Sequence, residues 1–204
     1  MSKLGTRYGN VKSMIVCEGM VRYIFGDKAV PRISFFGSLR SRRFDKADSG
    51  DALVLEYGGN VCDFDWQAIS EHPGGLHKPS RSLDDFRNTY LSLIRNIRSC
   101  GVQPLLLSLP GLRAGRYIDY VSQNRDRFNI LRWLGGDVSF INDWYNQYAQ
   151  ALRQLAEESD VPVIDIAGLI QQHPNPDEFY AADGIHLNDR GNALVTNVIR
   201  KFNF

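Results

Sequence analysis

Three short apolar runs constrain the fold of this chain most strongly. They cover residues 51–57, 103–109 and 161–166, and the first two are ended by Gly58-Gly59-Asn60 and Pro110-Gly111. Nearly continuous apolar runs are typical of strands that are buried on both faces of a parallel sheet. Each run therefore predicts an inner strand, with the residues that follow it at the carboxyl edge of the sheet.

Two weaker strand signals come earlier in the chain. Residues 30–36 contain Ile33, Phe35 and Phe36 and are ended by Gly37-Ser38, whereas residues 3–8 are interrupted by a glycine. Residues 11–25 mix apolar and small residues without a clean period, so no element is predicted there.

Amphipathic stretches alternate with the apolar runs. Ser82 and Asp85 have capping-box spacing and predict a helix start, and Gly101 suits the left-handed end of that helix. The expected caps of two later helices are Asn142 or Asp143, and Asn188 or Asp189. The expected core-facing stripes are Phe86, Tyr90, Leu93, Ile94 and Ile97; Tyr145, Tyr148, Ala149, Leu152, Leu155 and Ala156; and Leu194, Val195, Val198, Ile199 and Phe202.

Alternating strands and helices predict an α/β fold with a parallel sheet covered by helices on both faces. No linker, repeat or low-complexity segment interrupts the pattern, so one domain over residues 1–204 is expected. Residues 112–137 form a long excursion after the second apolar run, with a short helix expected around residues 129–134. Insertions at this edge of a sheet are often lids or substrate walls.

The composition excludes several classes of protein. The net charge is +1, from 24 basic and 23 acidic residues, which gives no electrostatic reason to expect nucleic acid or an anionic membrane as partner. The three cysteines are an odd and sparse set, so no disulfide framework is expected, and none lies in a C-x-x-C pair, so no structural zinc site is expected. No signal peptide or membrane span is apparent, and a cytoplasmic location is the default expectation.

The chemistry centres on Asp183 and His186, which stand three residues apart just before the last expected helix. A carboxylate at this spacing can accept a hydrogen bond from Nδ1–H of the imidazole. That bond fixes the tautomer and leaves Nε2 free to act as a base. The structural alternative is that Asp183 caps a turn and His186 is an ordinary loop histidine.

Small-residue turns are expected to gather near this pair. Gly9-Asn10, Gly37-Ser38 and Gly58-Gly59-Asn60 each end a predicted strand. Glycine lets backbone N–H groups approach a ligand closely, and an asparagine amide adds another donor. Together such donors can form an oxyanion hole, which stabilises the negative charge that develops on a carbonyl oxygen during acyl transfer.

Two blocks of the sequence resemble the SGNH, or GDSL-type, ester hydrolases. Residues 55–66 (LEYGGNVCDFDW) resemble a bacterial subgroup's form of the family's Gly-x-Asn-Asp block, and residues 183–188 (DGIHLN), followed by Gly191, resemble its Asp-x-x-His block. The resemblance covers most of the chain. It implies a three-layer α/β/α sandwich of the flavodoxin-like SGNH type, with a parallel sheet of about five strands.

The resemblance also implies roles for individual residues. His186 would be the base and Asp183 its orienting partner, while the Asn60 side-chain amide and the Gly37 backbone N–H would donate to the oxyanion. The alternative for Asn60 and Gly37 is that each is an ordinary turn residue at the end of a strand. No cofactor and no metal are expected.

The family's first block, Gly-Asp-Ser, is degenerate here. Its best match is Tyr8-Gly9-Asn10-Val11, where valine, which has no nucleophilic atom, stands in place of the serine; Val61 likewise replaces the second aspartate of Gly-x-Asn-Asp. Two other serines are candidates for the nucleophile. Ser13 is two residues beyond Val11, and Ser38 follows a predicted strand in a Gly-Ser-Leu sequence. For either serine, the alternative is a turn or helix-cap residue.

Two functional hypotheses follow. In the first, a serine attacks a small acyl or carbohydrate ester with His186 as base. In the second, the nucleophile is lost and the chain is a pseudoenzyme that binds a ligand or a partner.

The loop after residue 62 matches no standard metal-ligand spacing, although it contains Asp63, Asp65, His72 and His77. We expect it to be a solvated or substrate-wall loop. The aromatic residues Phe64, Trp66, Trp133, Trp144 and Tyr145 are expected in the core or in a pocket wall.

Overall fold

The computed structural model describes residues 52–56, 62–99 and 101–202, together with the backbone of four short strands between residues 13 and 29. The strands are β1 (Ser13–Cys17), β2 (Met20–Arg22), β3 (Ile24–Phe25), β4 (Lys28–Ala29), β5 (Ala52–Leu55), β6 (Gln103–Leu107) and β7 (Val163–Ile164). The helices are α2 (Trp66–Glu71), α3 (Leu83–Ser99), α4 (Ala114–Val121), α5 (Arg127–Trp133), α6 (Ser139–Glu158), α7 (Ile166–Gln171) and α8 (Asp189–Lys201), with a 3₁₀ turn η2 (Pro176–Phe179).

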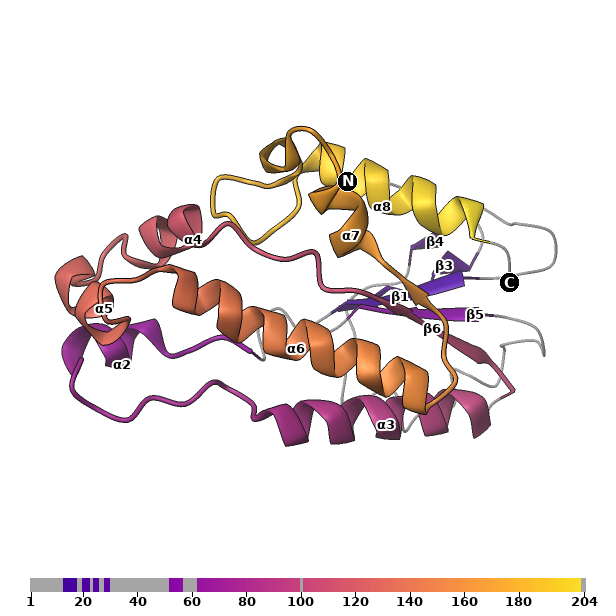
Figure 1. The fold of residues 1–204 in the computed structure, drawn as a ribbon. Coiled ribbons are helices and arrows are strands. Elements are labelled where there is room, and N and C mark those ends of the chain that lie inside the picture. Colours follow the sequence, from indigo (N-terminus) through magenta and orange to yellow (C-terminus); the bar gives the residue numbers. More distant parts are fainter. Residues whose placement is uncertain are drawn as a thin grey trace.

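The main sheet has the order β2-β1-β5-β6-β7 (Figure 1). Strands β1, β5, β6 and β7 are parallel to one another, and β2 is an antiparallel neighbour of β1. Strands β3 and β4 form a separate two-stranded pair. The predicted α/β class is confirmed, and the sheet has the expected five strands, of which four are parallel and β2 is antiparallel.

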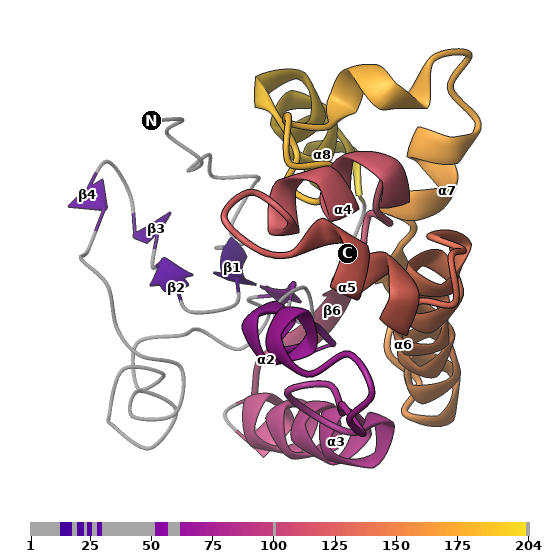
Figure 2. The same cartoon turned by 90° about the vertical axis from the view of Figure 1, so that its left-hand side faces the viewer.

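Helices cover both faces of the sheet, which gives the three layers that are visible in Figure 1 and, end on, in Figure 2. Successive residues of a strand point to opposite faces. Leu53 and Leu55 therefore pack with residues of α3 and α6 in one cluster, whereas Val54 packs with α7, η2 and α8 in the other. This alternation explains why β5 contains no polar residue, since both of its faces are buried.

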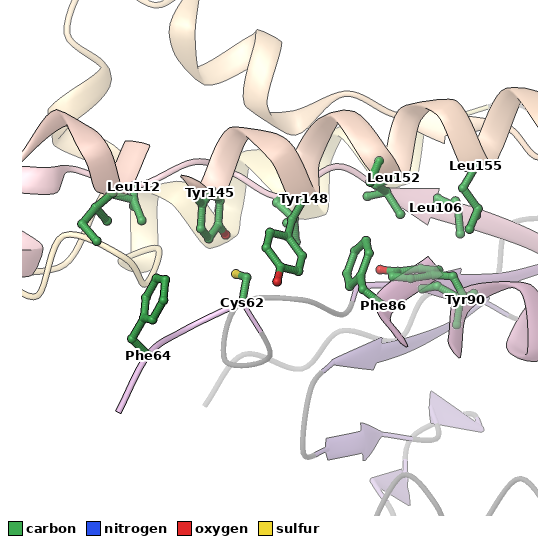
Figure 3. Close-up of a cluster of buried hydrophobic side chains, with 14 of the residues drawn as sticks. Cys62, Phe64, Phe86, Tyr90, Leu106, Leu112, Tyr145, Tyr148, Leu152 and Leu155 are labelled. Carbon is green, nitrogen blue, oxygen red and sulfur yellow. The ribbon is translucent and has the colours of Figure 1, made fainter. Parts of the chain in front are cut away.

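The larger cluster is dominated by aromatic and leucine side chains (Figure 3). Phe86 is 1% exposed and its ring packs edge-on against Tyr90 and Tyr148, at centroid distances of 5.0 and 5.3 Å. Edge-to-face ring pairs of this kind stabilise the fold by more than the burial of their surface area alone. The predicted stripes of α3 and α6 are buried in this cluster and in its surroundings, as expected.

Two helix starts are as predicted. Ser82 Oγ accepts a hydrogen bond from the backbone N–H of Asp85 (3.1 Å) and donates to its carboxylate (2.9 Å), which completes the capping arrangement of α3. Asn188 caps α8 and accepts from the backbone N–H groups of Arg190 and Gly191. Gly101 has a φ of +74°, the left-handed conformation expected after α3.

The predicted start of α6 is wrong. The helix begins at Ser139, one turn before the expected cap at Asn142 or Asp143, and Asp137 accepts hydrogen bonds from the Ser139 backbone N–H and hydroxyl, both at 2.8 Å. Ile141 is buried and extends the apolar stripe back from Tyr145 by four residues. The N-cap residue is Val138, which makes no side-chain capping hydrogen bond, so the apolar stripe indicates the start of this helix better than the Asn142 and Asp143 side chains do.

The other strand predictions have mixed outcomes. Strand β1 lies within residues 11–25, where no element was predicted, because a five-residue apolar strand is too short to show a period. Strand β7 is shorter than the predicted run, and Asp165 caps α7 instead of ending the strand. The predicted strands over residues 3–8 and 30–36 lie outside the described residues.

The excursion over residues 112–137 contains two helices. The expected short helix is present as α5, which Asp126 caps by accepting from the Asn129 backbone N–H (3.0 Å). Helix α4 was not predicted. Both helices lie beyond the ends of β5 and β6, on the same side of the molecule as α2 (Figure 1).

Candidate active site

Asp183 and His186 form a closed turn immediately before α8. The Asp183 Oδ1 atom accepts hydrogen bonds from the backbone N–H groups of Ile185 and His186, both at 3.0 Å, and Oδ2 lies 2.8 Å from His186 Nδ1. Because an ionised carboxylate only accepts hydrogen bonds, Nδ1 carries the proton of the neutral ring. The unprotonated Nε2 is then the basic atom, on a side chain that is 71% exposed.

The Asp183 carboxylate is held in its charged form. Burial by itself raises the pKa of Asp183, but the hydrogen bonds from the His186 backbone, the His186 ring and the Ile185 backbone outweigh it, so the pKa lies below its ordinary value of 3.8. The ionised Asp183 stabilises the protonated imidazole that forms when Nε2 accepts a proton.

Gly184, inside the turn, can only be glycine without rearrangement. Its φ is +75°, and a Cβ atom there would lie 2.7 Å from Arg116 Cβ, 2.8 Å from Arg113 O and 3.0 Å from Tyr117 N. The Gly184 carbonyl accepts a 2.7 Å hydrogen bond from the Arg113 backbone N–H. The start of α4 therefore packs directly against the backbone of the turn.

Arg113 strengthens this contact with its side chain. Its guanidinium lies 4.6 Å above the Tyr180 ring, and Nε is 2.7 Å from Asp177 Oδ1. The Tyr180 hydroxyl donates to the carbonyl of Pro110, which lies just before α4. The segment that leads into the Asp183–His186 turn is thus attached to the segment that follows β6.

On its other side, the turn is fixed to α8. The Asn188 side-chain amide donates to the carbonyls of Glu178 and Tyr180 at 2.8 and 3.0 Å, while its oxygen caps α8. Gly191 packs so closely on η2 that a Cβ atom would lie 2.5 Å from Phe179 O. These contacts explain the glycine that follows the Asp-x-x-His block.

A second polar cluster lies in the segment after β5. Asp63 Oδ1 accepts from the Phe64 backbone N–H (2.8 Å) and from Trp66 Nε1 (2.7 Å), and Trp66 Nε1 also lies 3.1 Å from the Tyr117 hydroxyl. Burial raises the pKa of Asp63, although hydrogen bonds from Tyr117, Phe64 and Trp66 partly oppose the rise. Asp63 is therefore half-buried and held by hydrogen bonds within its own segment, whereas Asp65 and His72 of the same loop are exposed.

The other residues of that loop have ordinary roles. Asp65 caps α2, and His77 Nε2 lies 2.8 Å from the carbonyl of His72. Within the part of the chain that the structure describes, no three histidine, cysteine, aspartate or glutamate side chains gather around a possible metal position. The nearby aromatic residues pack on one another, with Phe64 contacting Trp66, Trp133 and Trp144.

The remaining predicted site residues are not all described. Gly37, Ser38 and Asn60 lie outside the described residues, as do Val11 and Val61. Ser13 is the first residue of β1 and pairs with Ala52 at the amino end of the parallel strands. Ligand sites in such sheets lie beyond the carboxyl ends, so this backbone position does not favour Ser13 as a nucleophile.

A comparison with protein-family models places most of the chain in one family. Residues 24–194 match the GDSL-like lipase/acylhydrolase family. The chain belongs to this family. The resemblance seen in the Gly-x-Asn-Asp and Asp-x-x-His blocks is thereby confirmed.

Individual relatives are distant. The chain is 25% identical over 157 residues to the isoamyl acetate-hydrolyzing esterase 1 homolog of Bos taurus, covering 76% of this chain and 56% of that protein. The lipase/acylhydrolase of Enterococcus faecalis has a similar fold, with a TM-score of 0.50 and 20% identity, over 72% of this chain and 58% of the other. The chain thus spans little more than half the length of these relatives. In its described residues, no helix has the length and hydropathy that crossing a bilayer requires.

Proposed function

We propose that this chain is an ester hydrolase that acts on a small acyl or carbohydrate ester, with His186 as its general base. The observation that carries the proposal is the Asp183–His186 pair, in which Nδ1 is held by a charged carboxylate and Nε2 is left available. Membership of a family of lipases and acylhydrolases supports it. The bovine relative, which is named as a homolog of an ester-hydrolyzing enzyme, also supports the proposal.

The proposed reaction has two halves. A serine hydroxyl attacks the acyl carbon of the ester while His186 Nε2 accepts its proton, and the oxyanion of the tetrahedral intermediate receives hydrogen bonds from the Asn60 amide and the Gly37 N–H. The intermediate collapses as the imidazolium returns its proton to the leaving alcohol. Water then repeats the sequence on the acyl-enzyme, with His186 again as base, and releases the acid.

The identity of the serine is part of the proposal. Ser38 and Ser13 are the candidates, because the best match to the family's Gly-Asp-Ser block has Val11 in place of the serine. The family match over residues 24–194 includes Ser38 but neither Val11 nor Ser13. The register of β1 makes Ser13 the less suitable of the two, since its backbone lies at the amino end of the strands. Peptide mapping of a covalently labelled protein distinguishes them.

A pseudoenzyme is the competing proposal, and the valines at positions 11 and 61 favour it. In that case the fold and the Asp183–His186 turn persist, but the chain binds a ligand or a partner without turnover. An esterase must instead show turnover that depends on the His186 imidazole. The two proposals therefore differ for His186→Ala: the substitution abolishes turnover in an esterase and changes nothing in a pseudoenzyme.

The test is hydrolysis of p-nitrophenyl acetate and of acetylated sugars by the wild type, His186→Ala and the control His72→Ala. His72 is an exposed histidine at the end of α2, so its removal controls for non-specific imidazole catalysis. The proposal expects turnover in the wild type and in His72→Ala, and a loss of at least about a hundredfold in His186→Ala. Equal turnover in all three proteins would reject His186 as the base, and no turnover in a folded wild type would favour the pseudoenzyme.

A further inference from the structure

Helix α4 lies between the two polar clusters described above. Its first turn packs on the Asp183–His186 turn, through the Arg113 N–H bond to the Gly184 carbonyl and through the backbone at Tyr117, which leaves no room for a side chain at Gly184. The Tyr117 side chain ends in the other cluster, where its hydroxyl meets Trp66 Nε1 and Asp63. One residue of α4 therefore contacts both parts of the candidate site.

The surroundings of the Tyr117 hydroxyl are closed. Tyr117 is 4% exposed and Trp66 is 5% exposed. Burial raises the pKa of the Tyr117 hydroxyl above its ordinary value, and the nearby charge of Asp63 raises it further, so the hydroxyl stays protonated. It is then a permanent donor in a cluster whose acceptor is a partly buried carboxylate.

Asp63 connects this cluster to the other predicted catalytic block. It stands three residues after Asn60, the residue to which the proposed function assigns an oxyanion donor. Its hydrogen bonds to Phe64 N and Trp66 Nε1 fix the backbone of the segment that leaves this block and enters α2. A displacement of Asp63 would consequently move the backbone of residues 63–66.

We propose that Tyr117 is a positioning residue, whose hydroxyl sets the placement of the segment after β5 relative to the Asp183–His186 turn. The inference rests on the proposed function, which assigns an oxyanion donor to Asn60, three residues before Asp63 in the sequence, and the general base to His186. Tyr117 itself touches neither reacting group. It acts only on the relative placement of the two segments. Acyl transfer is sensitive to such placement, because small displacements of catalytic groups lower the rate by large factors.

The matched variants are Tyr117→Phe and Tyr120→Phe. Both remove one hydroxyl from α4, but Tyr120 is 47% exposed and lies outside both clusters. Asp63→Asn is a second variant of the same cluster, which keeps the shape of the carboxylate and removes its charge. It serves if Tyr117→Phe fails to fold, as judged by near-ultraviolet circular dichroism.

Hydrogen–deuterium exchange is the primary measurement, because it does not depend on turnover. In Tyr117→Phe we expect faster exchange both in peptides covering residues 62–66 and in those covering residues 181–187. In Tyr120→Phe we expect wild-type exchange in both. Unchanged exchange over residues 181–187 in folded Tyr117→Phe would overturn the inference.

Kinetics on the same proteins separates positioning from simple stability. The expected result is a kcat that falls about tenfold or more in Tyr117→Phe, with KM within about twofold of wild type and full folding at the assay temperature. A wild-type kcat in that variant would overturn the inference. A wild type without turnover would reject the proposed function instead, and the exchange measurement would still decide whether Tyr117 couples the two segments.

Discussion

Substituting Gly184 by alanine tests whether the Asp183–His186 turn is held in place by α4. At a φ of +75°, any residue other than glycine is strained, which costs roughly 1–2 kcal/mol. The added methyl group would also lie 2.7 Å from Arg116 Cβ and 2.8 Å from Arg113 O. Two of the three nearest atoms belong to the backbone of α4, so relief requires movement of the helix or of the turn, at a typical overpacking cost of about 1–3 kcal/mol.

The two contributions together predict that Gly184→Ala lowers the free energy of unfolding by about 2–5 kcal/mol. For a chain of this size, each kcal/mol corresponds to about 2–4 °C, so the midpoint of thermal unfolding should fall by at least about 4 °C. Urea unfolding followed by circular dichroism measures the change directly. We also expect the variant to lose ester hydrolysis at temperatures where it is still folded, because the turn carries His186.

Gly115→Ala is the matched control. Gly115 lies in α4 close to the same contact, but a Cβ atom there meets nothing within 4 Å. Alanine is the better helix former, so this variant should be as stable as wild type or more stable, by up to about 1 kcal/mol. If Gly184→Ala and Gly115→Ala were equally stable, the reasoning from the close approach of α4 to the turn would be refuted.

Three further predictions concern stability. Asn188→Ala removes both the cap of α8 and the amide bonds to the Glu178 and Tyr180 carbonyls, so the free energy of unfolding should fall by about 1–3 kcal/mol in urea; a change below about 0.5 kcal/mol would contradict this role. Folding lowers the pKa of Asp183, so the stability that this carboxylate provides is present above its unfolded pKa near 3.8 and is lost as the pH falls through the lower folded value. Asp183→Asn should therefore be less stable than wild type at neutral pH, and the difference in the free energy of unfolding should shrink in acid. A difference that stays constant with pH would disprove this linkage. Phe86→Ala, deep in the larger cluster, should cost about 3–5 kcal/mol by thermal or urea unfolding, and a cost under about 1 kcal/mol would show that the cluster collapses around the cavity.

The fold was largely predictable because its signals are local and periodic. The apolar run over residues 51–57 became β5 since both of its faces are buried, and the Ser82 cap and the stripe of α3 specify that helix without reference to the rest of the chain. Helix α4 was missed although its buried residues Ala114, Tyr117, Ile118 and Val121 have helical spacing. The stripe is only two turns long, and Gly115 lowers the helix propensity of its first turn.

The candidate site was predictable only where its contacts are local. The hydrogen bond between Asp183 and His186 spans three residues, and the spacing alone indicated it. The contact of Arg113 with Gly184 and that of Trp66 with Tyr117 join segments that are far apart in the sequence. These contacts depend on how the strands place the segments that follow them side by side at the carboxyl edge of the sheet, which no local pattern of residues specifies.

The most direct test of the account is covalent labelling with a fluorophosphonate, read by intact mass, for wild type, His186→Ala and His72→Ala. If His186 activates a serine, wild type and His72→Ala should each gain a single adduct, which peptide mapping assigns to one serine, and folded His186→Ala should gain none. Equal labelling of His186→Ala, or no labelling of folded wild type, would contradict the claim that this chain is a histidine-activated serine hydrolase.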